Sequence, residues 1–334
     1  MYYPLLTQPY FRHGSETPWG GDKLKAYFGK PSPDDTTGEA LEASALPGMS
    51  SLIMNGSLAA LTLDKAQEKW GEALSGSQEF PLLLKLLDAR ETLSVQVHPG
   101  DAYAQKRHGK RGKTEAWVVL SCDPGAKIAY GLKSGATLAD VENGNMEEAL
   151  NWVKVAPGDV YYVPHGMVHA LGAGVQAYEI QQASDVTYRI WDWGRVGKDG
   201  KPRELHLEDA KNVVRPELQL AKIGGATVLC EGGSRTYYVS DENFELCRLN
   251  VAGDMPLPEG RMLFLTPLGE CELIWGDEVV VMEPLATAVI PAAMKGAMIC
   301  GNLTALLSST PDQAALRQEL GYRAENVSGL TSPV

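Results

Sequence analysis

The sequence lacks the features that mark secreted and membrane-spanning proteins. No stretch approaches the roughly 18–20 consecutive apolar residues of a membrane span. The first residues, MYYPLLTQPYFRHG, do not combine a basic segment with a long apolar run as a signal peptide does. The five cysteines are scattered without a C-x-x-C pair, which argues against a disulfide framework and a cysteine zinc site. We therefore expect a reduced, cytoplasmic protein that does not bind membranes.

Positive charge is also in short supply. Lys and Arg number 30 against 42 Asp and Glu, a net charge of −12. An acidic chain of this kind is a poor general binder of nucleic acid or anionic lipid, so an anionic ligand needs a local basic pocket. Hydrophobic residues make up 44% of the 334 residues, which excludes wholesale disorder and suggests two domains.

Helical patterns are few, and the sequence predicts helices at 62–74, at 137–153 with a break at Gly144, and at 208–214. Short runs rich in Val, Ile, Leu and Tyr between Gly, Pro, Asp and Asn are typical of strands. These runs are 93–97, 116–120, 127–130, 160–163, 175–180, 261–265, 271–275, 278–282, 286–290 and 297–299. Such short, evenly spaced strands favour a mainly β fold of sandwiches or barrels with a few short helices.

A sequence pattern that occurs twice indicates how the strands are organised. Residues 157–164 read PGDVYYVP and residues 284–291 read PLATAVIP, each a strand between turn prolines. We interpret them as corresponding hairpins of two jelly-roll (cupin) barrels. The charged segment 205–222 marks the boundary, which predicts domains at 1–206 and 207–334.

Three segments carry residues typical of a metal site. In LSVQVHP (93–99), strand alternation points Gln96 and His98 to the same side. Glu115 begins an apolar strand, where a buried carboxylate needs a cationic partner. His169 opens a strand after a Gly turn. His98, Glu115 and His169, with Gln96 as a candidate fourth ligand, form a nitrogen and oxygen set suited to zinc or a similar divalent ion.

Charged residues near these segments are candidates for contacting an anionic substrate. The basic stretch 105–113 is expected to be a solvated loop, except for Lys113. Alternation aims Lys113 to the side of Glu115, where it would contact substrate or move protons. Asp185 and Arg189 lie in the loop after the strand at 178–182, and Arg189 is placed to pair with phosphate or stabilise developing negative charge.

At these residues the sequence resembles the type I mannose-6-phosphate isomerases (phosphomannose isomerases), in their short bacterial form without a helical insertion. The segments that carry the resemblance are WGG (19–21), PLLLKLLDARETLSVQVHP (81–99), GKTEAW (112–117), PGDVYYVPHGMVHAL (157–171), QQASDVTYR (181–189) and PRELH (202–206). The resemblance implies a cupin fold with metal ligands at Gln96, His98, Glu115 and His169. It also implies an active-site arginine at Arg189, pocket residues at Lys113 and Asp185, and a phosphate contact at Ser94.

The activity implied by the resemblance is the interconversion of mannose 6-phosphate and fructose 6-phosphate through an enediol, with one zinc ion per chain. Proton abstraction needs a base, and Lys113, Asp185 and a zinc-bound water all remain candidates. The competing hypotheses are a non-enzymatic sugar-phosphate-binding cupin and a metal oxygenase on the same fold. The sequence makes no prediction of the oligomeric state.

The C-terminal half departs from this metal pattern. Aligning Pro164 with Pro291 places Gly296 where His169 stands, and no histidine follows His206. We therefore expect residues 207–334 to form a degenerate cupin domain without a metal.

Overall fold

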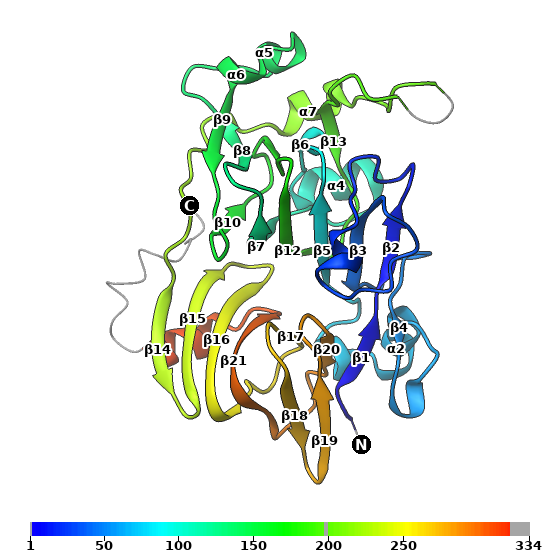
Figure 1. Cartoon of the computed structure of the whole chain (residues 1–334), viewed down its shortest axis with the longest axis vertical. Helices are drawn as coiled ribbons and strands as arrows, with labels where there is room; N and C mark the ends of the chain where they lie inside the picture. Colours follow the sequence, from blue (N-terminus) through cyan, green and yellow to red (C-terminus); the bar gives the residue numbers. More distant parts are fainter. Residues whose placement is uncertain (1, 197–199, 321–334) are drawn as a thin grey trace. The chain divides into compact units, whose positions relative to one another are not determined.

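The secondary structure is dominated by strands, as the sequence predicts. A computed structural model describes residues 2–196 and 200–320 (Figure 1). The helices are α1 Lys23–Ala26, the 3₁₀ turn η1 Gly56–Leu58, α2 Leu63–Trp70, α3 Glu72–Ser75, α4 Asp101–His108, α5 Leu138–Glu142, α6 Met146–Ala149, α7 Leu207–Val213 and α8 Gln313–Leu320. Within the described part of the chain, no helix is long and apolar enough to cross a membrane.

The strands fall into two groups along the chain. The first group is β1 Leu5–Gln8, β2 Tyr10–His13, β3 Thr37–Ala43, β4 Leu52–Ile53, β5 Leu82–Ala89, β6 Val95–Val97, β7 Glu115–Cys122, β8 Lys127–Leu132, β9 Leu150–Lys154, β10 Val160–Val163, β11 His169–Ala170, β12 Val175–Gln182 and β13 Tyr188–Trp191. The second group is β14 Ala226–Cys230, β15 Gly233–Ser240, β16 Glu245–Pro256, β17 Leu263–Pro267, β18 Cys271–Trp275, β19 Glu278–Met282, β20 Thr287–Ile290 and β21 Ala297–Ser309.

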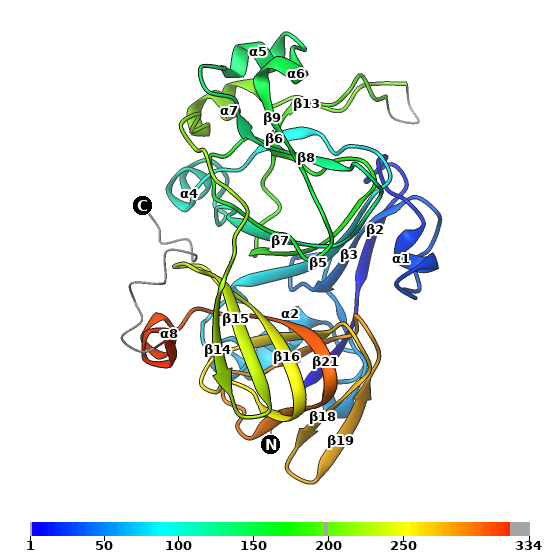
Figure 2. The same ribbon diagram turned by 60° about the vertical axis from the view of Figure 1, so that its left-hand side comes forward.

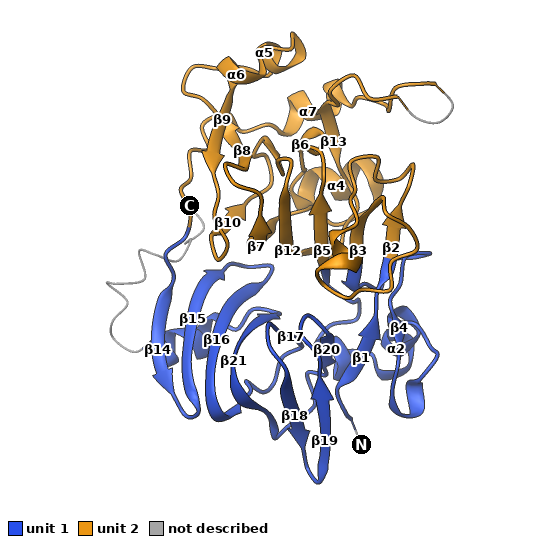
Figure 3. Ribbon diagram, in the orientation of Figure 1, with its two compact units in different colours: residues 1–10, 41–84, 223–334 blue, residues 11–40, 85–222 orange. Residues whose placement is uncertain are grey.

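The chain forms two compact units whose segments interleave (Figure 3). One unit comprises residues 1–10, 41–84 and 223–334, and the other comprises 11–40 and 85–222. This grouping differs from a single division at 206/207, because the N-terminal strand β1 pairs with β20. The domain limits 1–206 and 207–334 stay a prediction.

The unit that contains the C-terminal strands is built on one large sheet. Its order is β14-β15-β16-β21-β17-β20-β1-β4, with the β18–β19 hairpin attached to β21. β16 and β21 pair in one continuous antiparallel register from Glu245↔Ser309 to Pro256↔Met298. The sheet curls around a core that includes Leu249, Leu265 and Ile299, all fully buried.

The other unit is a sandwich of two sheets (Figure 2). One sheet has the order β10-β7-β12-β5-β3-β2 and the other has the order β13-β6-β11-β8-β9. Side chains from both sheets meet in one core cluster, among them Trp117 of β7 and Tyr130 of β8. The short strands β6 and β11, together with the start of β7, carry the predicted metal ligands into this sandwich.

The helix predictions are confirmed in part. Residues 62–74 form α2 and α3, separated at Gly71, and 208–214 correspond to α7. The break at Gly144 is present, with α5 on one side and α6 on the other. A helix through 150–153 is wrong, because these residues form β9 and pair with β8.

The basic stretch is not all loop. Residues up to His108 belong to α4, and Gly109 ends the helix in the left-handed conformation. Lys106, Arg107 and His108 therefore occupy the last helical turn, where cations favourably face the negative end of the helix dipole. The two proline-flanked strands lie as predicted: β10 ends at the residue before Pro164, and β20 at the residue before Pro291.

Candidate metal centre

Three predicted ligands converge inside the sandwich. His98 follows β6, Glu115 is the first residue of β7, and His169 is the first residue of β11. One nitrogen or oxygen atom of each lies within 4.8 Å of the others, and all three side chains are buried. Nε2 of His169 is 3.3 Å from Oε1 of Glu115, and Nε2 of His98 is 3.5 Å from Oε2.

Backbone carbonyls orient both imidazoles toward this cluster. Nδ1 of His98 donates to the carbonyl of Val186 at 3.0 Å, and Nδ1 of His169 donates to that of Met167 at 2.9 Å. Each ring therefore presents its Nε2 lone pair to the cluster, an orientation typical of metal-binding histidines. Burial lowers the pKa of His98 to about 3 and also lowers the pKa of His169, so both rings are neutral.

Several polar atoms of the cluster are buried without a hydrogen-bond partner. Among the described residues, Nε2 of His98 and both carboxylate oxygens of Glu115 are buried without a hydrogen-bond partner. The ammonium group of Lys113 lies 2.9 Å from Oε2 and stabilises the carboxylate in part. Two imidazole nitrogens still face Oε1 and Oε2, and a further cation would stabilise that arrangement. Two imidazoles and a carboxylate are ligands that suit a divalent metal ion, so the residues present fit such an ion.

Gln96 lies beside this set. Its side-chain Nε2 is 3.2 Å from Nε2 of His169, while its Oε1 accepts a hydrogen bond from Oγ of Ser94 at 3.3 Å. A half-turn of the amide would place Oε1 toward the cluster, as a fourth ligand requires. Ser94 is buried and contacts Gln96, so its predicted phosphate contact stays a prediction.

A chain of alternating buried charges continues from the cluster. Nζ of Lys113 is 2.9 Å from Oε2 of Glu115 and 4.0 Å from Glu179. Lys85 then joins Glu179 at 3.6 Å to Glu39 at 3.3 Å. The prediction that Lys113 points to the side of Glu115 is thereby confirmed. Burial would lower the pKa of Lys113, but Glu115 and Glu179 outweigh it and raise the pKa, so the amine stays protonated.

Replacing Lys113 with methionine is expected to destabilise the metal-free chain by about 3–5 kcal/mol, the usual cost of removing one partner of a buried ion pair. Once the cation between them is removed, Glu115 and Glu179 repel each other. The measurement is chemical denaturation in the presence of a chelator. Lys110→Met is the matched control, because Lys110 forms an exposed pair with Asp185 and should cost less than about 1 kcal/mol. Equal losses in both variants would contradict a structural role for Lys113.

The outer end of the charge chain predicts a pH effect. Burial would raise the pKa of Glu39, but Lys85 and Arg12 outweigh it and lower the pKa to about 2. The ionised carboxylate therefore contributes stability that is complete above its ordinary pKa of 4.5 and is lost as pH falls toward 2. Glu39→Gln should lose about 3 kcal/mol at pH 7 and approach the wild type near pH 2. Unfolding free energies measured from pH 2 to 7 check this, with Glu16→Gln as the exposed control.

Arg189 lies in the same row of the sheet as two candidate ligands. β13 pairs Arg189 with Gln96, and on the other side of β6 Gln96 pairs with His169. Directly paired residues of neighbouring strands point to the same face, so Arg189 faces the cluster side. Its Nη1 donates to the carbonyl of Glu204, and its buried Nε lacks a partner among the described residues. Burial and the nearby Arg203 lower its pKa to about 10, which leaves it charged at neutral pH.

Asp185 is not brought into the cluster. It is exposed and forms an ion pair with Nζ of Lys110 at 2.7 Å, one residue before the Val186 carbonyl that orients His98. Burial would raise the pKa of Asp185, but the Lys110 contact lowers it.

Sequence reasoning missed the buried charges that support the site. Lys85 and Glu179 stand alone among apolar neighbours in LLLKLLDA and VQAYEIQQ, and that isolation is the signal that could have found them. Nothing in the sequence pattern pairs either one with Lys113.

Comparisons with known proteins show which family the chain belongs to. Residues 13–116 match a family model described as phosphomannose isomerase type I, catalytic domain. A mannose-6-phosphate isomerase from Streptococcus mutans is 35% identical over 300 residues, which cover 87% of this chain and 94% of that protein. The chain belongs to the type I mannose-6-phosphate isomerase family. ManA, a mannose-6-phosphate isomerase from Bacillus subtilis, is 43% identical over 288 residues, covering 83% and 89% of the two chains.

Solved structures of mannose-6-phosphate isomerases have the same fold. The crystal structure of the enzyme from Bacillus subtilis aligns with a TM-score of 0.85 at 32% identity and covers 91% of this chain and 99% of that one. A variant of the Salmonella typhimurium phosphomannose isomerase aligns with a TM-score of 0.72 at 17% identity, a likeness of fold alone. The predicted fold class, mainly β and of the cupin type, is confirmed, although the sheets are stacked as a sandwich and not closed into barrels.

Proposed function

We propose that the chain is an isomerase that interconverts mannose 6-phosphate and fructose 6-phosphate and holds one zinc ion. The observation that carries the proposal is the buried cluster of His98, Glu115 and His169 in a chain of this family. Gln96 is the proposed fourth ligand. Two imidazoles and a carboxylate suit zinc, the divalent ion that we propose.

The proposed reaction moves a proton between C2 and C1 through an enediol. A bound divalent ion would supply Lewis-acid polarisation of the substrate oxygens. Nζ of Lys113 lies 2.9 Å from Oε2 of Glu115, and we propose that it contacts the substrate there and moves protons. We propose the ionised Asp185, which lies outside the cluster and pairs with Lys110, as one candidate proton acceptor. A water held at the metal site is the other candidate.

Arg189 supplies fixed positive charge in the proposed mechanism. Arg189 pairs across the sheet with Gln96, which pairs in turn with His169, so Arg189 lies next to two candidate ligands. Its Nε–H donates to none of the described residues. A guanidinium in that place would stabilise negative charge that develops on the enediolate, or pair with the phosphate. We propose Ser94 as a further substrate contact.

The cytoplasm is the proposed location. All five cysteines are unpaired, as expected in a reducing compartment. A sugar phosphate is the proposed small-molecule partner.

The test is an isomerase assay on a single preparation with its metal content measured. Mannose 6-phosphate should turn over to fructose 6-phosphate, activity should fall on chelation, and zinc should restore it. Stoichiometric metal without turnover would favour the non-enzymatic sugar-phosphate-binding cupin. Bound iron with oxygen consumption would favour the metal oxygenase. Either result would overturn the proposed function.

A further inference from the structure

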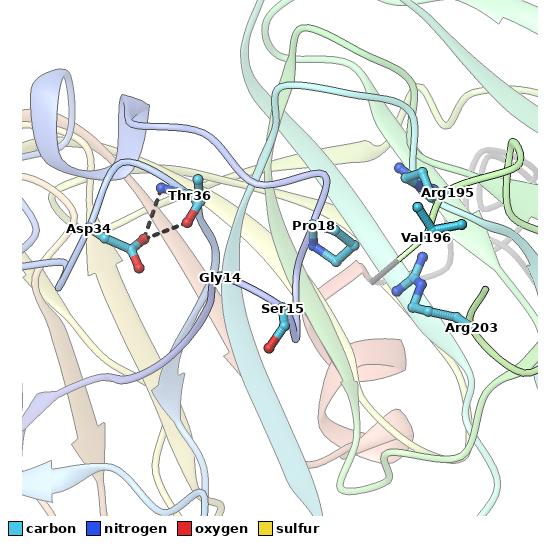
Figure 4. Close-up of a pocket in the computed structure, with 8 residues that line it drawn as sticks. All are labelled: Gly14, Ser15, Pro18, Asp34, Thr36, Arg195, Val196 and Arg203. Atoms are coloured by element: carbon cyan, nitrogen blue, oxygen red, sulfur yellow. Dashed lines mark hydrogen bonds between the residues drawn. The ribbon is translucent and has the colours of Figure 1, made fainter. Parts of the chain in front are cut away.

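The segment PRELH (202–206) has no part in the proposed reaction, although it is one of the segments that carry the family resemblance. At its start, Nε of Arg203 donates to the buried carboxylate of Asp192, just after β13, at 2.7 Å. Nη2 of Arg195 donates to the same carboxylate at 2.8 Å, and both arginines line one cavity (Figure 4). The start of the segment is therefore tied to the chain that follows β13.

The end of the segment is held by helix packing. Helix α7 begins at Leu207, directly after His206. Ala210 of this helix is fully buried in a core cluster that also contains Tyr188 and Ile190 of β13. Because both ends of the segment are fixed against β13 and its continuation, the surrounding structure sets the position of His206.

Three hydrogen bonds join this segment to Arg189. The backbone N–H of Arg189 donates to Nδ1 of His206 at 3.1 Å, and the backbone N–H of His206 donates to the Arg189 carbonyl at 2.7 Å. Nη1 of Arg189 donates to the carbonyl of Glu204 at 2.8 Å. β13 is the last strand of its sheet, so His206 supplies the partners that a further strand would otherwise give to the main chain.

The ring of His206 is in the protonation state that this contact needs. Nδ1 accepts a hydrogen bond only when it carries no proton, so the neutral ring holds its proton on Nε2. Burial, followed by the positive charge of Arg189, lowers the pKa of His206. The nearby carboxylates of Glu204 and Asp209 oppose this shift, and His108 adds to it. The ring is therefore neutral at pH 7 and available as an acceptor.

We propose that His206 is a positioning residue for Arg189. By accepting the Arg189 N–H at the edge of the sheet, the ring fixes β13 where Arg189 pairs with Gln96, with Nη1 on the Glu204 carbonyl. The buried Nε–H of Arg189 is then left for the substrate. The inference rests on the proposed function, in which Arg189 stabilises the enediolate or pairs with the phosphate. Displacement of a reacting or charged group by about 1 Å can cost about 100-fold in rate.

The test compares two amide side chains at position 206 in the metal-loaded full chain. The amide oxygen of His206→Asn reaches the place of Nδ1, whereas the longer His206→Gln places its amide near Nε2 and supplies no acceptor for the Arg189 N–H. Hydrogen–deuterium exchange of the Arg189 amide, measured by NMR, should be about tenfold faster in His206→Gln and His206→Ala than in the wild type. His206→Asn should restore most of the protection.

The matched control is His108→Ala. Nε2 of His108 lies 2.7 Å from the hydroxyl of Tyr188, the residue before Arg189, and makes no contact with the Arg189 main chain. Exchange of the Arg189 amide should therefore stay at the wild-type rate in this variant. Metal analysis and thermal denaturation establish that every variant is loaded and folded.

Steady-state kinetics show whether the contact acts through the guanidinium. His206→Ala and His206→Gln should lower kcat or raise KM by about tenfold, in whichever constant Arg189→Ala also changes. His206→Asn should recover most of this loss. In the Arg189→Ala background, His206→Ala should cause no further loss, because the two residues act as one unit.

Three results would overturn the positioning role. These are unchanged exchange at Arg189 in folded His206→Gln, a full additional kinetic loss from His206→Ala in the Arg189→Ala background, and an equal effect in His108→Ala. A wild type that does not isomerise mannose 6-phosphate would instead overturn the proposed function. Exchange at the Arg189 amide would still decide, in that case, whether His206 holds the arginine.

Discussion

Replacing His98 or His169 with alanine should remove the bound metal and lower isomerase kcat by about 10³-fold. In the proposed site each imidazole would supply one of three or four protein ligands, and the ion is expected to contribute several kcal/mol of charge stabilisation in the transition state. Loss of either ring leaves Glu115 with only one imidazole beside it. Metal analysis by mass spectrometry and steady-state kinetics on the same samples measure both effects.

The control for this prediction is His165→Ala. His165 lies on the segment between β10 and β11, outside the group of side chains whose atoms converge. It should therefore keep its metal and most of its activity. Full metal content with near-normal activity in both His98→Ala and His169→Ala would refute the ligand assignment.

Arg189→Ala should keep the metal and lose about 10²- to 10³-fold in kcat if the guanidinium stabilises charge that grows in the transition state. Its position one strand from Gln96, with a buried Nε that lacks a partner among the described residues, favours that role. A side chain that only anchors the phosphate would instead raise KM with little change in kcat. Kinetics on metal-replete enzyme separate the two roles.

Arg189→Lys is the informative second variant. It keeps a positive charge but loses the forked donor geometry, so partial recovery of kcat is expected. Circular dichroism and metal analysis establish that both variants are folded and loaded. Wild-type kcat and KM in Arg189→Ala would show that the residue has neither role.

The local sequence pattern predicted the limits of a strand correctly where turn residues flank a short apolar run. The strands at 160–163, 271–275 and 278–282 have the predicted limits, because turn residues bound each apolar run on both sides. Period-two alternation also related Lys113 to Glu115 correctly. The helix prediction failed at 150–153, because these residues form strand β9 and pair with β8.

The sequence by itself determined the mainly β class and the residue types of the candidate metal site, with the strand starts that carry them. These features follow from local pattern and from the family's motifs. Only the tertiary structure decided that Lys85 and Glu179 link Glu39 to Lys113. It also decided that Arg189, Gln96 and His169 share a row, and that Arg203 and Arg195 share one carboxylate. Such relations depend on cross-strand register and loop closure between distant residues, which local alternation does not encode.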